Sequence, residues 1–229
     1  MLGNITIFFI IEMIGTVAFA SSGAMVAIKK ELDLLGVVVL GVTTAVGGGM
    51  LRDMILGNVP PALFTNPVYV IAGFLTVLAL FAVVRLNQRI LESRSIEMYE
   101  KVMNIFDAVG LGAFTVTGIN TAVMAGYGDY HFLAAFLGVL TGVGGGVLRD
   151  IMAGQTPYIL RKHFYACASI IGAITYVTLL GMTDIDLAVV VSACLVVVIR
   201  LLATRYCWNL PKATRKVKGE AADQADQTE

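Results

Sequence analysis

Charged residues are scarce in this sequence, and so are long polar stretches. Only 14% of its 229 residues are charged, whereas 58% are hydrophobic and the mean hydropathy is +0.84. A soluble domain has about 25% charged and about 45–50% apolar residues. Because apolar runs recur along the whole chain, the composition excludes a soluble domain and predicts an all-α integral membrane protein.

Cysteine and histidine are nearly absent. The three cysteines are unclustered, and the two histidines, His131 and His163, stand alone. Disulfide frameworks and metal sites need clustered sets of these residues. The sequence also contains no GxSxG, HExxH or nucleotide-binding loop. We therefore expect no metal, no cofactor and no enzymatic activity.

The sequence also has no net charge, because 16 Lys and Arg residues balance 16 Asp and Glu residues. A nucleic-acid-binding protein needs a basic surface, so nucleic acid is excluded as a partner. The first apolar run has no basic residue before it and carries Glu12, a poor match to a signal peptide. We expect this run to be a span of the mature protein.

The chain does contain seven apolar stretches close to the roughly 20 residues that a spanning helix needs. They cover residues 5–28, 34–56, 67–85, 102–125, 132–153, 163–181 and 187–204. We expect residues 1–205 to form one membrane domain. The charged segment 86–101 is expected in water, and residues 206–229 are predicted to be a disordered cytoplasmic tail.

Basic residues between the spans gather on one side of the membrane. They are Lys29, Lys30, Arg85, Arg89, Arg94, Lys101, Arg161, Lys162, Arg205, Lys212, Arg215, Lys216 and Lys218. The opposite side has only the acidic Asp129, Asp184 and Asp186. The positive-inside rule then predicts a multi-pass protein of the cell (inner) membrane, with the N-terminus outside and the C-terminus cytoplasmic.

The chain also contains an internal repeat, in which residues 44–60 align with residues 141–157. Both segments contain GGG-x-L-R-D, and matches extend upstream and downstream. The further matches are Glu12, Gly15, Phe19, Ser22, Gly23, Tyr69 and Ala72 against Asp107, Gly110, Phe114, Thr117, Gly118, Tyr165 and Ala168. Each copy, about 5–85 and about 102–181, holds three spans, so the second copy must be inverted. The predicted fold is an inverted 3+3 repeat plus one extra helix, an arrangement typical of transport proteins.

Three consecutive glycines stand in the second span and again in the fifth. They are Gly47, Gly48, Gly49, Gly144, Gly145 and Gly146. Because each glycine weakens a helix by up to about 1 kcal/mol, we expect a kink or break whose freed carbonyls face an ion pathway. The alternative is close helix packing, the usual role of small residues in membrane helices.

Each glycine run leads into an arginine and an aspartate, Arg52-Asp53 and Arg149-Asp150. Adjacent residues on a helix point about 100° apart, so neither arginine is expected to pair with its own aspartate. A charge inside the membrane nevertheless needs a partner.

The inverted repeat suggests which partners these arginines have. It predicts two symmetry-related ion pairs, Glu12 with Arg52 and Asp107 with Arg149. The pairs either lock the fold or contribute to the ion pathway, and both roles stay open. Arg200, near the end of the last span, is expected to extend its charge to the membrane surface.

Four hydroxyl residues could line a polar path through the membrane. They are Ser22, Thr44, Thr117 and Thr141. Hydroxyls in membrane helices also bond to their own helix backbone, and this structural role is the one we favour.

The two GGG-x-x-R-D segments in a 3+3+1 helical protein resemble the prokaryotic TRIC (trimeric intracellular cation) channels, which are also grouped as a two-copy putative glycine transporter domain. The resemblance covers residues 1–205. It implies a homotrimer with a pore in each protomer, selective for monovalent cations and chiefly K⁺. It further implies that the glycine runs kink the two pore-lining helices, with the Arg-Asp pairs close by.

Two functions follow from these patterns. The first is a potassium channel gated by kinked helices two and five, with membrane potential acting on the intramembrane arginines as one stimulus. The alternative is a secondary transporter of glycine or another small solute by alternating access. Membrane lipids are the other expected partners, including bound lipid. The lysine-bearing motif of animal members is missing at residues 144–147, so control by calcium or phosphoinositide is not carried over.

Overall fold

The computed structural model describes residues 2–87, 96–161, 164–206 and 208. Within these ranges the chain is helical and has no strand. Six of its helices are long and apolar enough to span a membrane, and a shorter apolar helix, α8, makes the seventh. The predicted all-α membrane fold is confirmed. The predicted tail, apart from Tyr206 and Trp208, lies outside the described residues.

Each expected span falls on one helix, and two short helices not expected from the sequence lie in the connections. The helices are α1 (Leu2–Lys29), α2 (Leu34–Leu56), α3 (Ala62–Thr65), α4 (Val68–Leu86), α5 (Ile96–Ala122), α6 (His131–Met152), α7 (Tyr158–Arg161), α8 (Phe164–Leu179) and α9 (Ile185–Arg205), with a π-helical turn, η2 (Val123–Tyr127), after α5.

The largest difference from expectation is at α5, which begins at Ile96 within the segment predicted to be a polar connection. Contacts with α1 explain the additional turn. The Tyr99 hydroxyl donates to the Met25 carbonyl at 2.7 Å, and Lys29 forms an ion pair with Glu100. These tertiary contacts stabilise a turn that the polar sequence alone would not favour.

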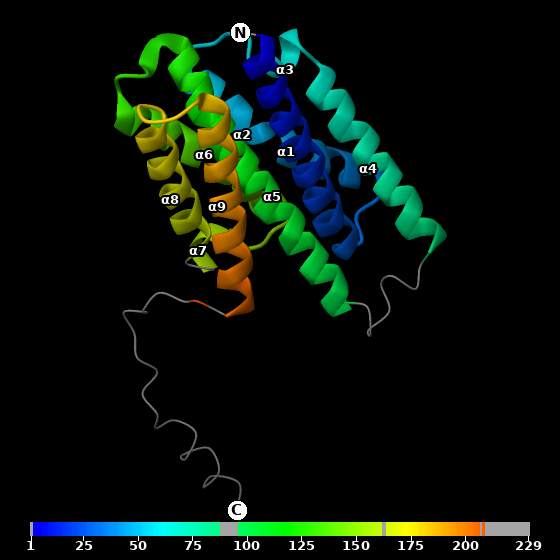
Figure 1. Ribbon diagram of the computed structural model, residues 1–229. Coiled ribbons are helices and arrows are strands. Elements are labelled where there is room, and N and C mark those ends of the chain that lie inside the picture. The colour runs from blue at the N-terminus through cyan, green and yellow to red at the C-terminus, as the bar shows by residue number, and fades with distance from the viewer. Residues whose placement is uncertain (1, 88–95, 162–163, 207, 209–229) are drawn as a thin grey trace, which may run out of the picture.

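The helices confirm the inverted repeat. Helices α1, α2, α3 and α4 have α5, α6, α7 and α8 as their counterparts. The short helices α3 and α7 lie at opposite ends of the molecule, α3 near the start of α1 and α7 near the end of α9 (Figure 1). Helix α9 has no counterpart and packs against α5 and α8.

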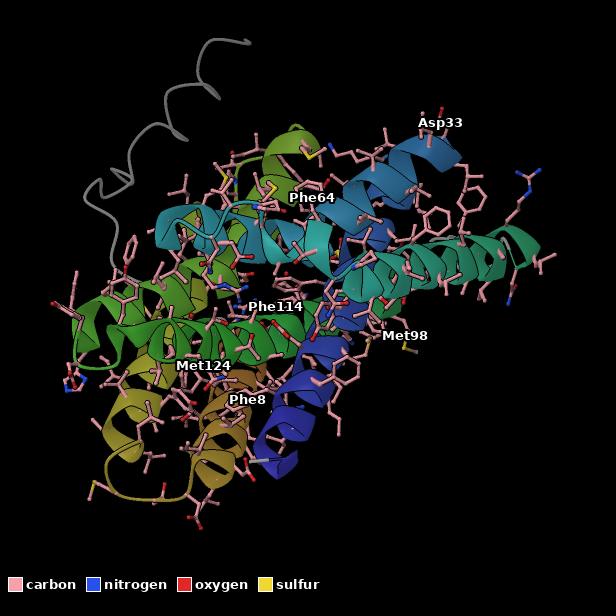
Figure 2. All side chains as sticks on the ribbon, turned by 90° about the horizontal axis from the view of Figure 1, so that it is seen from above. Phe8, Asp33, Phe64, Met98, Phe114 and Met124 are labelled. Carbon is pink, nitrogen blue, oxygen red and sulfur yellow. The ribbon has the colours of Figure 1, made fainter. Side chains whose placement is uncertain are left out.

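The two repeats meet through reciprocal aromatic packing. The ring of Phe114 packs over Gly15, and the ring of Phe19 packs over Gly110. The two ring centroids lie 5.2 Å apart. Phe114 lies near the middle of the bundle in Figure 2, whereas Asp33 lies at its edge. Residues that correspond in the two repeats therefore form one contact across the pseudo-twofold axis.

Candidate functional site

The backbone at the glycine runs is not broken as the sequence predicts. Helices α2 and α6 stay helical through all six glycines. The glycines with positive φ in the described chain are Gly57, Gly126 and Gly154, and none of them belongs to a run. The predicted break is therefore wrong. A bend of the helix axes and a role in lining the pore stay predictions.

Close contact between the two helices explains why the backbone does not open. A Cβ atom built on Gly48 would lie 2.1 Å from the Thr141 carbonyl oxygen, and one on Gly145 would lie 2.2 Å from the Thr44 carbonyl oxygen. Only glycine permits this approach, and the packing contacts offset its low helix propensity. The packing alternative is correct for these two glycines.

A charged cluster, here called the second cluster, lies beside this crossing in the second repeat. Arg149 Nη1 lies 2.7 Å from Asp107 Oδ1, and Arg149 Nε lies 2.8 Å from Asp150 Oδ1. Arg149 Nη1 also donates to the Ser22 hydroxyl oxygen at 2.6 Å, which joins the second repeat to the first. Arg149 is only 1% exposed. The predicted Asp107–Arg149 pair is confirmed.

Arg200 belongs to the second cluster too, and its expected extension to the membrane surface is wrong. The side chain is buried, with Arg200 Nη2 3.7 Å from Asp107 Oδ2 and Arg200 Cζ 4.5 Å above the Tyr165 ring. The buried carboxylate and aromatic face hold the charge inside. Sequence reasoning missed this role for Arg200 and Tyr165, although the repeat of Tyr69 as Tyr165 is a signal for the tyrosine.

The corresponding first cluster lies in the first repeat. Arg52 Nε donates to Asp53 Oδ1 at 2.9 Å, and Arg52 Nη1 lies 3.9 Å from Glu12 Oε1. Tyr69 lies against Glu12. The predicted Glu12–Arg52 pair is confirmed, but it is looser than its counterpart, and the Glu12 side chain is 25% exposed.

Each arginine does pair with the aspartate that follows it, contrary to expectation. The arginine side chain is long enough to fold back along the helix and overcome the angle between adjacent residues. The second oxygen of each aspartate accepts a backbone N–H beyond the helix, from Ala62 to Asp53 at 2.9 Å and from Tyr158 to Asp150 at 2.7 Å. Each Arg-Asp pair thus ties the end of its helix to the start of the next short helix.

The four hydroxyl residues do not share one role. The hydroxyls of Thr44 and Thr141 donate to the carbonyls of Leu40 and Leu137, the backbone bonding we favoured. Ser22 instead accepts from Arg149. Thr117 lies buried with no hydrogen-bond partner for its hydroxyl in the described part of the chain.

A cavity of about 500 Å³ opens beside the second cluster. It is lined by Val26, Lys29, Lys30, Glu100, Met103, Gln155 and Tyr158. The Tyr158 ring lies 5.8 Å from Arg149 Cζ. Burial, and then the charge of Asp107, raises the pKa of the Tyr158 hydroxyl, so this group stays neutral at physiological pH. Tyr158 therefore lies both in the wall of this cavity and beside Arg149 of the second cluster.

Among the described residues, no group of three His, Cys, Asp or Glu side chains is placed to hold a metal ion.

Comparisons with known proteins match this architecture. The model of the "Glycine transporter" family matches residues 9–85 and 104–180, one match on each repeat. The UPF0126 inner membrane protein YadS of Escherichia coli (strain K12) is 37% identical over 203 residues, covering 88% of this chain and 93% of that protein. The UPF0126 membrane protein YvgT of Bacillus subtilis (strain 168) is 34% identical over 204 residues, covering 88% and 94%.

Solved structures give the same result. One described with the structural basis for conductance through TRIC cation channels has a TM-score of 0.77 and 37% identity, covering 92% of this chain and 98% of that one. The TRIC orthologue from Rhodobacter sphaeroides has a TM-score of 0.78 and 33% identity, covering 89% and 100%. The chain belongs to the prokaryotic TRIC family. In this TRIC-family chain the first cluster, and the second cluster apart from Arg200, lie within the residues that the family model matches.

Proposed function

We propose that this TRIC-family chain is a cation channel that conducts K⁺, with a pore in each protomer of a homotrimer. The observation that carries the proposal is the match to solved TRIC cation channels over about nine-tenths of the chain, at 30–37% identity and TM-scores of 0.77–0.78. The buried charges of this chain support the same function, since ionisable groups inside a membrane usually mark ion or proton pathways.

The proposed path runs within the protomer, from the first cluster past the glycine runs to the second cluster. Gly48 and Gly145 bring the backbones of α2 and α6 into contact on this route. The described conformation is accordingly a closed one, and opening requires these two helices to separate. The charges on Arg52 and Arg149 would then respond to membrane potential, which is worth about 2.3 kcal/mol per charge per 100 mV crossed.

The proposed setting is the inner membrane, the location given in the name of YadS, with the N-terminus outside and bound lipids around the trimer. The low burial of helix α4 supports a contact between this helix and lipid or another subunit. Only 17% of its most apolar stretch is buried in the protomer, against 72% for α5. We propose one membrane domain over residues 1–205.

A carrier for glycine or another small solute is the second candidate, favoured by the description of the family model. The inverted repeat would also serve alternating access.

Recording from purified protein in planar bilayers separates the two candidates. We expect unitary K⁺ currents that do not depend on glycine. Saturable glycine uptake into proteoliposomes without unitary currents would instead establish the carrier. Chemical crosslinking in a mild detergent should give a trimer, and a clean monomer would contradict the proposed assembly.

A further inference from the structure

Helix α9 is fitted to the second repeat through two glycines. A Cβ atom on Gly112 of α5 would lie 2.8 Å from the Ala193 carbonyl oxygen, and one on Gly172 of α8 would lie 2.1 Å from Val196 Cγ2. The positions corresponding to these glycines in the first repeat hold Val17 and Thr76. The surface that receives α9 therefore exists in only one of the two repeats.

This fit brings Arg200 into the second cluster. Arg200 is 2% exposed, and its contacts are the Tyr165 ring and the 3.7 Å approach to Asp107. Within the described chain, Arg200 Nε and Asp107 Oδ2 have no hydrogen-bond partner. The contact is electrostatic and aromatic, and it can be released without breaking an optimised hydrogen bond.

Arg200 also balances the charges of the second cluster, whereas the first cluster has no corresponding arginine among the described contacts and stays unbalanced. There, Arg52 faces the carboxylates of Glu12 and Asp53, which leaves one negative charge in excess. In the second cluster, Arg149 and Arg200 balance Asp107 and Asp150.

The two clusters also differ in how far their carboxylate side chains are exposed. The Glu12 side chain is 25% exposed, whereas that of Asp107 is 4% exposed. The balanced cluster is thus the more deeply buried one.

We propose that α9 is a latch, in which Arg200 is a positioning residue that holds the second cluster closed to cations. The inference rests on the proposed channel function. When Arg200 leaves Tyr165 and Asp107, the cluster acquires a net negative charge and resembles the first cluster. A hydrated carboxylate then becomes available to a passing cation, which a neutral and desolvated cluster excludes.

The test compares Arg200→Gln with Arg205→Gln in planar bilayers. Both variants remove one positive charge from the same end of α9, but Arg205 is exposed. We expect Arg200→Gln to raise the open-to-closed ratio roughly fivefold to thirtyfold, the range for loss of one desolvated cation–π contact and a loose ion pair. Arg205→Gln should change the ratio by less than about twofold. Tyr165→Leu should act in the same direction as Arg200→Gln, and Tyr165→Phe, which keeps the ring face, should act less.

A structural role alone gives a different pattern. If Arg200→Gln lowers the melting temperature but leaves the same open-to-closed ratio as Arg205→Gln, the latch is overturned. If Arg200→Gln does not fold, Arg200→Lys and Tyr165→Leu decide the question, and an unchanged ratio in both would overturn the latch.

A second measurement does not depend on conduction. Ser22, fully buried beside Arg149, is replaced by cysteine in a chain without native cysteines and labelled with a small cationic thiol reagent. Arg200→Gln should speed this labelling severalfold, whereas equal rates would contradict the latch. Absence of currents from the wild-type chain would overturn the proposed function, and the labelling rates would still decide whether Arg200 closes the cluster.

Discussion

At the scale of single residues, the two clusters use the same residue types but differ in closeness. Arg149 and Asp107 approach to 2.7 Å in a buried setting, whereas Arg52 and Glu12 approach to 3.9 Å with Glu12 partly exposed. Removing one partner of a buried pair leaves an unpaired charge in a desolvated site, and the cost falls as the exposure of the pair rises. Symmetry-related positions are therefore expected to contribute different amounts to the stability of the fold.

Neutralising Asp107 and Glu12 separately measures this difference. Asp107→Asn should destabilise the protein by about 3–5 kcal/mol, the usual cost of breaking a buried pair. Glu12→Gln, the matched change in the first repeat, should cost no more than about 1 kcal/mol. The measurement is thermal unfolding of the purified variants in detergent. Equal losses would show that the exposure of Glu12 does not weaken its pair.

At the scale of helices, the glycine runs act where α2 and α6 cross. The three glycines of α2 are not equivalent, because their neighbours differ. A Cβ on Gly48 would meet the Thr141 backbone, whereas one on Gly49 would lie 3.7 Å from Arg52 Nη2, an ordinary contact distance. Position relative to the partner helix, rather than glycine itself, decides what each residue contributes.

Substituting alanine at the two positions tests this distinction. Gly48→Ala should destabilise by about 1–3 kcal/mol, because backbone atoms cannot move aside as a side chain can. Gly49→Ala should be neutral or stabilise by up to about 1 kcal/mol through its higher helix propensity. Unfolding midpoints of the two variants give the comparison. A loss at Gly49 equal to that at Gly48 would mean that helix flexibility, not the crossing, requires the glycines.

At the scale of the whole molecule, inversion of the repeats separates the two ends of the proposed path. The connection after α2 and the connection after α6 lie at opposite ends of the bundle (Figure 1). The basic residues between the spans predict which end faces the cytoplasm. Orientation therefore determines from which side a cation meets the first cluster.

Cysteine labelling in intact cells checks this orientation. In a chain without native cysteines, Asp184→Cys should react with a membrane-impermeant maleimide from outside. Glu100→Cys, at the opposite end, should react only after lysis. The reverse pattern would place the N-terminus in the cytoplasm and invert the proposed path.

Much of the site was accessible from the sequence because it depends on local composition and on the repeat. Spacing of charges within the repeats correctly predicted the Glu12–Arg52 and Asp107–Arg149 pairs. The same reasoning missed Arg200, because α9 belongs to neither repeat and no internal match indicates where its face packs. It also failed for Asp53 and Asp150, whose partners depend on how a long arginine side chain folds back.

Scarcity of charge and recurrence of apolar runs determined by themselves that this is a membrane protein with seven spans, since hydrophobic length is a property of consecutive residues. The doubled motif likewise determined the inversion, because three spans in each copy reverse its direction. Only the tertiary structure decided that the glycines close a helix crossing and that Arg200 completes the second cluster. Both depend on atoms brought together from distant helices, and the free energy of a buried glycine or arginine is set by those neighbours.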